Sequence, residues 1–254
     1  ILASCNRNAV DLSYTNAKGE GPQLENLVFR FSHALAGDSV LNQWDSTQYV
    51  RFKPAIPGRF RWEQPDQLVF SPSRPLPPST NFKAELTDEI IENSKFNRIE
   101  GADAVEFFTP GLKLEDLHAS WVVENEQSNH AVPRLDLFFN YDVSPAIIKD
   151  NLKLKIGGKP VTYRMVTLSD DSRVSLDITG IQPKDEDISV QVDINKGIVP
   201  KGGTNATSKE IVATTGIPSP FNLVIDDVTA EHDGIAGTVN VQTSQQVTAD
   251  KLSS

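Results

Sequence analysis

The sequence predicts an all-β protein built of antiparallel β-sandwiches in tandem, and three of its features support this prediction. Short segments of alternating apolar and polar residues recur along the chain, turn residues separate them, and similar segments return after about 100 residues. Strict alternation is the pattern of a half-buried strand, because successive side chains point to opposite faces of a sheet. The 254 residues include 16 prolines and 15 glycines, which suits a turn-rich β protein.

The predicted strands follow one another along the chain with turn residues between them. They are 27–35, 59–62, 67–72, 82–86, 151–156, 173–181, 187–194 and 237–243. Turns are expected at Pro57-Gly58, Pro77-Pro78, Gly157-Gly158 and Gly202-Gly203. One helix of about two turns is expected at 144–152, with Ser144 as N-cap and Pro145 at the first helical position. About seven short strands per 100 residues predict immunoglobulin-like sandwiches.

An internal repeat sets the expected domain boundaries. The segments that resemble one another are Leu27–Leu35, Leu135–Val143 and Gly237–Val247. Equivalent strand positions are therefore expected at Phe29/Phe31, Leu137/Phe139 and Val239/Val241, with Phe82 also matching Ile188. The predicted organisation is a linker at 1–8, complete domains at 9–112 and 113–216, and the start of a truncated third domain at 217–254.

Composition argues against several classes of protein. The formal net charge is −10 and no cluster of Lys and Arg occurs, so nucleic acid is not an expected partner. No run approaches the roughly 18 apolar residues that a membrane helix needs. The acidity favours a soluble monomer.

No catalytic or metal-binding pattern is present in the sequence. The histidines, His33, His118, His130 and His232, are scattered and lack metal-ligand spacing. We therefore expect no catalytic residues, no metal, no cofactor and no enzymatic activity. Trp44, Trp62 and Trp121 lie far apart, and we expect all three to pack in cores instead of forming a sugar-binding row.

Residues 56–86 carry a pattern that resembles the first macroglobulin-like domain of bacterial alpha-2-macroglobulins. The pattern is a G-x-F-x-W strand, an L-x-F-x-P strand, and then L-x-P-x-T-x-F leading into a closing strand. Its residues here are Gly58, Phe60, Trp62, Leu68, Phe70, Pro72, Leu76, Pro78, Thr80 and Phe82. The upstream strand 27–35 also fits, whereas residues 113–254 enter only through the repeat.

The resemblance implies a function without catalysis. Members of this family trap proteases: a bait segment is cut, the molecule collapses around the protease, and an internal C-x-E-Q thioester can couple to it. The chain would be the N-terminal scaffold of a membrane-tethered protease trap, and target proteases would be partners of the full-length protein. The alternative is a surface lipoprotein whose immunoglobulin-like modules bind glycans or other cell-surface partners; a mechanical spacer is a third possibility.

The single cysteine, Cys5, gives an expectation about location. One thiol cannot form an internal disulfide, and Asn-Arg-Asn follows Cys5, so it is not the thioester cysteine. Leu2-Ala3-Ser4-Cys5 resembles the lipobox at the end of a bacterial lipoprotein signal peptide. We expect lipidation of Cys5, removal of residues 1–4, and a lipid-anchored protein of the bacterial cell envelope, periplasmic or associated with the outer membrane.

Overall fold

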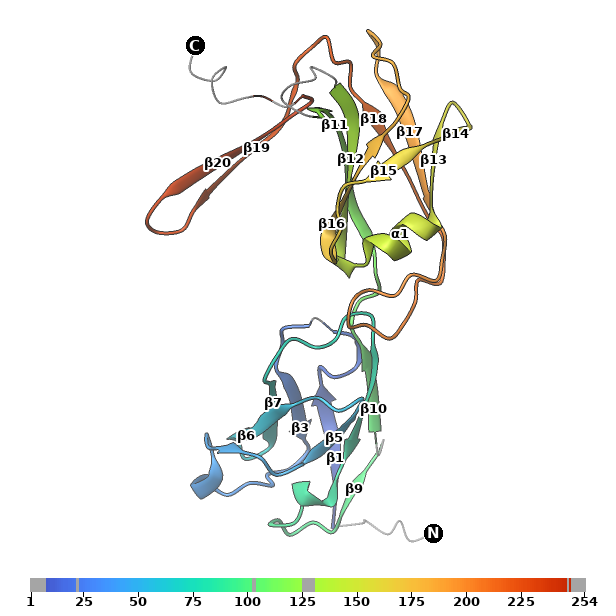
Figure 1. Ribbon diagram of the computed structural model, residues 1–254. Helices are drawn as coiled ribbons and strands as arrows, with labels where there is room; N and C mark the ends of the chain where they lie inside the picture. The colour runs from blue at the N-terminus through green and yellow to red at the C-terminus, as the bar shows by residue number, and fades with distance from the viewer. Residues whose placement is uncertain (1–7, 22, 102–103, 125–130, 246, 248–254) are drawn as a thin grey trace. The chain divides into compact units, whose positions relative to one another are not determined.

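The computed structural model describes residues 8–21, 23–101, 104–124, 131–245 and 247, and it is an all-β protein (Figure 1). The chain divides into two compact units. Unit 1 is Ile1–Gly111 with Gly202–Asn205, and unit 2 is Leu112–Lys201 with Ala206–Ser254. The segment Gly202–Asn205 belongs to unit 1 through Asn205, whose backbone N–H donates to the Ser79 carbonyl oxygen at 2.7 Å.

Unit 1 is a sandwich of a six-stranded and a four-stranded sheet. The six-stranded sheet has the order β4 (Trp44–Asp45), β6 (Gly58–Gln64), β7 (Gln67–Pro72), β3 (Leu27–Phe31), β1 (Ala9–Thr15) and β9 (Arg98–Glu100). The four-stranded sheet has the order β2 (Gly19–Glu20), β10 (Ala104–Phe108), β8 (Asn81–Leu86) and β5 (Val50–Lys53). Pairing is antiparallel except for β1 with β9 and β10 with β2. The predicted alternation is visible in β3, where Phe29 and Phe31 are buried and Arg30 is exposed.

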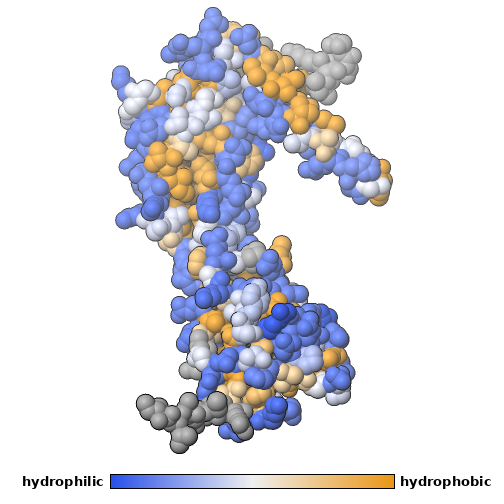
Figure 2. All heavy atoms as spheres, turned by 180° about the vertical axis from the view of Figure 1, so that it is seen from behind, coloured by the Kyte–Doolittle hydropathy of each residue, from blue (hydrophilic) through white to orange (hydrophobic). Residues whose placement is uncertain are grey.

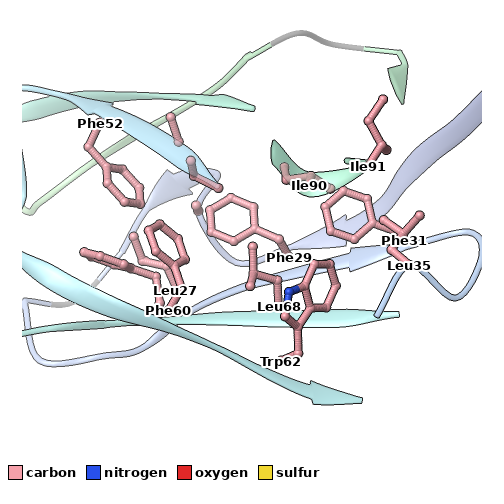
Figure 3. Close-up of a cluster of buried hydrophobic side chains, with 14 of the residues drawn as sticks. Leu27, Phe29, Phe31, Leu35, Phe52, Phe60, Trp62, Leu68, Ile90 and Ile91 are labelled. Carbon is pink, nitrogen blue, oxygen red and sulfur yellow. The ribbon is translucent and has the colours of Figure 1, made fainter. Parts of the chain in front are cut away.

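Aromatic side chains from both sheets fill the space between them (Figure 3). The ring of Phe70 in β7 lies 4.6 Å from that of Phe52 in β5 and 4.7 Å from that of Phe60 in β6, measured between centroids. Since Phe52 belongs to the other sheet, this cluster joins the two layers. Trp62 extends the cluster toward Phe31, at a centroid distance of 6.1 Å.

Unit 2 is a sandwich of two four-stranded sheets around an aliphatic core. One sheet has the order β11 (Leu114–Val123), β12 (Ala131–Val143), β16 (Asp171–Ile178) and β15 (Tyr163–Met165). The other has the order β14 (Lys159–Val161), β13 (Leu152–Ile156), β17 (Ile188–Ile194) and β18 (Ile211–Ile217). The expected helix is present as α1 (Pro145–Asn151), which follows Ser144 and buries Ile148. Ser144 is the N-cap residue, as expected, but its side chain makes no capping hydrogen bond.

The two units share one strand order, as the sequence repeat predicts. The order β1-β3-β7-β6 in unit 1 corresponds to β11-β12-β16-β15 in unit 2, and β10-β8-β5 corresponds to β18-β17-β13. Phe31 and Phe139 therefore lie on equivalent strands, β3 and β12, and both are buried. Phe82 and Ile188 lie on the equivalent strands β8 and β17 and are buried as well.

The third copy of the repeat does not form a core in the described residues. It is a hairpin of β19 (Ile225–His232) and β20 (Gly237–Thr243), which pair with each other in a two-stranded sheet. Val239 and Val241 lie on β20, the second strand of this hairpin, and they are 63% and 51% exposed. Two strands are too few to enclose side chains on both sides.

One close approach in unit 1 requires a glycine. Gly58 in β6 pairs with Pro72 in β7, and a Cβ at position 58 would lie 2.4 Å from Cζ of Phe70 and 2.5 Å from the carbonyl oxygen of Ser71. The Phe70 ring thus occupies the space that a side chain would need. Replacing this glycine means displacing either the aromatic cluster or the strand.

We predict that Gly58→Ala lowers the free energy of unfolding of unit 1 by about 1–3 kcal/mol, the usual cost of overpacking a dense core. Urea denaturation followed by circular dichroism and tryptophan fluorescence measures the change. Gly37→Ala is the matched control, because a Cβ there meets nothing within 4 Å and its φ is −82°; it should change stability by less than about 0.5 kcal/mol. Equal midpoints for the two variants would contradict the packing account.

Candidate interaction surfaces

The residues of the macroglobulin-like pattern lie together in unit 1, on β6, β7, β8 and the connection before β8. Six of them have buried apolar side chains that form the core: Phe60, Trp62, Leu68, Phe70, Leu76 and Phe82. The other four, Gly58, Pro72, Pro78 and Thr80, shape the backbone around that core. Their placement gives these residues a structural role, and Gly58, Pro72 and Phe82 also line hollows on the surface.

Thr80 has a definite structural role in this pattern. It is fully buried, and its hydroxyl donates to the carbonyl oxygen of Pro78 at 2.8 Å. Its backbone N–H donates to Oγ1 of Thr109, whose hydroxyl in turn donates to the carbonyl oxygen of Pro77. Two threonines therefore satisfy the polar groups of a proline-rich turn that has few N–H donors of its own.

The predicted lipidation site, Cys5, and the rest of the lipobox, Leu2, Ala3 and Ser4, lie outside the described residues, as does His130. Within the described ranges, no helix is long and apolar enough to cross a membrane. The same ranges contain no group of three or more His, Cys, Asp or Glu side chains that could hold a metal ion.

Trp44 departs from the sequence-based expectation. Trp62 and Trp121 are buried as expected, but Trp44 is 46% exposed. It lies on β4, a two-residue strand at the edge of the six-stranded sheet, where no second layer of core covers it. The guanidinium carbon of Arg61 lies 4.6 Å from the centroid of the Trp44 ring, a cation–π contact that holds the ring in place.

Two adjoining hollows flank the end of β7. The first has a volume of about 500 Å³ and is lined by Trp44, Gly58, Arg59, Ser71, Pro72 and Ser73. The second has a volume of about 330 Å³, and Leu24 and Arg74 are among its lining residues. Because Ser71, Pro72 and Ser73 line both hollows, the two meet at Pro72. Sequence reasoning missed these hollows, since their lining residues come from strand ends and loops that are far apart in sequence.

A network of charges covers one sheet face of unit 2. The carboxylates of Asp136 and Asp177 are almost fully buried, at 4% and 1% residue exposure. Arg173 donates to Asp136 at 2.8 Å, and the Ser175 hydroxyl also donates to Asp136. Arg134 and Arg164 both donate to Asp177, at 2.8 and 2.9 Å.

The network sets three guanidinium groups against two buried carboxylates, and Arg164 also pairs with Glu124 at 3.1 Å. The hydrogen bond to Asp136 raises the pKa of Arg173 above its ordinary value, and the hydrogen bond to Asp177 does the same for Arg164. Buried carboxylates are tolerated only when such partners replace water. The alternation of Arg134 with Asp136 and of Arg173 with Asp177 is a signal in the sequence that could have predicted this face.

Three residues of this sheet have the side chains of a catalytic triad but not its geometry. His118 and Ser175 lie opposite Asp136 on the two neighbouring strands. In a Ser–His–Asp triad the imidazole lies between hydroxyl and carboxylate and takes the hydroxyl proton. Here the carboxylate lies in the middle, and Arg173 already donates to it. Ser175 and Asp136 therefore belong to the charge network, and the three residues do not have the arrangement of an activated nucleophile.

Comparison with known proteins gives one distant relationship. The chain is 22% identical over 223 residues to the Alpha-2-macroglobulin homolog of Yersinia pestis. The matched region is 85% of this chain but only 11% of that protein, so the chain spans about a tenth of its relative's length. No family model matches the chain. The coarse relationship to a bacterial alpha-2-macroglobulin homolog agrees with the pattern at residues 56–86.

Solved structures that resemble the chain do so only weakly. An L,D-transpeptidase from Mycobacterium tuberculosis H37Rv has a TM-score of 0.28 and 12% identity, with 81% of this chain and 76% of that chain covered. An L,D-transpeptidase from Mycobacterium smegmatis gives a TM-score of 0.29 and 12% identity over the same shares. These values are too low to relate the fold or activity of the chain to those enzymes.

Proposed function

We propose that this chain is a non-catalytic N-terminal scaffold of a membrane-tethered bacterial protease inhibitor of the alpha-2-macroglobulin type. The observation that carries the proposal is the similarity to the Yersinia pestis homolog across 85% of the chain. The pattern residues of β6, β7 and β8 support it, because they build the core of unit 1 and leave no reactive group exposed. In this proposal the two sandwiches are spacers of fixed shape, and protease capture belongs to the full-length protein.

We further propose that residues 217–254 begin a third sandwich. The directly opposed pairs Val228–Val241 and Ala230–Val239 share one face of the β19–β20 hairpin. Thr229 and Asn240 are opposed on the other face, and side chains opposite each other project to the same side of a sheet. Figure 2 shows apolar residues exposed along this hairpin. Such an amphipathic hairpin is suited to covering a second sheet.

The scaffold role predicts that the 254-residue chain alone does not inhibit proteases. The assay incubates the purified chain with several broad-specificity proteases and follows cleavage of a large protein substrate. We expect unchanged substrate cleavage, because trapping needs a bait segment and the collapse that its cleavage triggers. The full-length protein is the positive control and should protect the large substrate. Stoichiometric protection by the chain alone would overturn the scaffold assignment.

Tethering predicts that Cys5 carries the anchor. In a bacterial host, the precursor with Cys5→Ser should move from the membrane fraction to the soluble fraction, because each buried CH₂ of an acyl chain contributes about 0.8 kcal/mol to membrane binding. Ser4→Ala keeps a small residue before the cysteine and should remain with membranes. The readout is the distribution of the protein after ultracentrifugation. Sedimentation of Cys5→Ser with membranes would contradict lipidation at this residue.

A further inference from the structure

The two hollows of unit 1 share the lining residues Ser71, Pro72 and Ser73, and together they are called here the Pro72 groove. An exposed apolar side chain stands in each half: Trp44, 46% exposed, in one and Leu24, 82% exposed, in the other. Large apolar side chains left at this exposure beside a hollow are typical of sites that receive a partner's side chains. The groove therefore offers two apolar anchor points on either side of Pro72.

One half of the groove also has an open sheet edge. The register of β4 with β6 ends at the pair Asp45–Phe60. The Trp62 carbonyl oxygen accepts a hydrogen bond from the Asn42 N–H, on the side of β6 where β4 lies. Every second residue of a strand directs its backbone N–H and C=O to the same side, so Phe60 and Gly58 direct theirs to that side too. Gly58 lies on β6, two residues before Phe60, so β4 has already ended opposite it, and it lines the hollow. Its N–H and C=O are placed to extend the ladder to an added strand.

The charges of the groove differ from those of the chain as a whole. Arg59 and Arg74 line it and are exposed, and neither has an ion-pair partner in the described part of the chain. Glu25 is the single carboxylate among the lining residues. The lining is thus net positive on a chain of formal net charge −10, and it favours an anionic ligand.

The free hydrogen-bonding groups of the groove suit a peptide better than a sugar. The Ser73 hydroxyl already donates to the Pro57 carbonyl oxygen at 3.2 Å, and the Gln23 amide donates to the Leu76 carbonyl oxygen at 2.5 Å. These bonds use the Ser73 hydroxyl hydrogen and one of the two amide hydrogens of Gln23. The strand edge at Gly58 and two guanidinium groups match the backbone and the carboxylates of a peptide.

From these features we propose that the Pro72 groove binds an extended acidic segment of a partner protein. An apolar side chain of the segment packs on Trp44 and a second one packs on Leu24, one to each side of Pro72. Carboxylates of the segment lie between Arg59 and Arg74, and its backbone pairs with Gly58. The groove would give the scaffold a docking function that is independent of protease trapping.

The test selects ligands for the purified 254-residue chain from a phage-displayed library of random 12-residue peptides. Recovered sequences are synthesised with a fluorescent label, and their binding is measured by anisotropy. We expect the peptides to combine acidic with apolar residues, and Trp44→Ala and Arg59→Glu each to weaken binding by about tenfold or more. Arg51→Glu, a charge reversal at an exposed arginine on β5, is the matched control and should change affinity less than about twofold.

Several outcomes would overturn the proposal. Recovery of no peptide above background, or of peptides whose binding survives both groove substitutions, would exclude this docking site. Binding on a glycan array that is lost in Trp44→Ala would assign the groove to a saccharide instead. Failure of the full-length protein to bind the selected peptides would show that its own chain covers the groove. Circular dichroism of each variant confirms that it is folded.

Discussion

The packing of Phe70 against Phe52 and Phe60 is the contact on which unit 1 depends. It joins the two sheets of the sandwich and fixes how closely β6 can approach β7. Because the ring occupies the Cβ position of residue 58, the strand must carry glycine there. The same close approach leaves Gly58 and Pro72 at the surface, where they form the floor of a hollow beside Trp44. One internal contact thus shapes both the core and the groove.

Unit 2 reaches the same strand order by different means. Its largest fully buried side chains are aliphatic, among them Leu135, Leu137 and Leu176, in place of the phenylalanines of unit 1. One of its sheet faces carries carboxylates buried under arginines, centred on Asp136 and Asp177. Hydrogen bonds to charged partners are stronger than neutral ones, but each carboxylate needs its partners to offset desolvation.

The strands could be predicted from the sequence because their signal is local. The alternation in 27–31 and 188–194 shows which side chains face inward, and Ser144-Pro145 marks the start of the helix. The exposure of Trp44 could not be predicted in this way, since it depends on β4 lying at a sheet edge. The groove was missed for the same reason: its walls come from the ends of β4, β6 and β7 and from residues 23–26, which are far apart in sequence. The buried charges could be predicted only from the spacing of Arg134 and Asp136 on one strand and of Arg173 and Asp177 on the next.

The central claim is that the described part of the chain holds two closed sandwiches and one hairpin without a core. Amide hydrogen exchange followed by NMR tests this claim most directly. Exchange slows where strands are buried and paired on both sides. The account predicts the strongest protection on β3 and β12, at Phe29 and Leu137, and exchange at least about 100-fold faster at Val228 and Val239. Equal protection of the β19–β20 hairpin would contradict it, because the hairpin would then belong to a packed core within this chain.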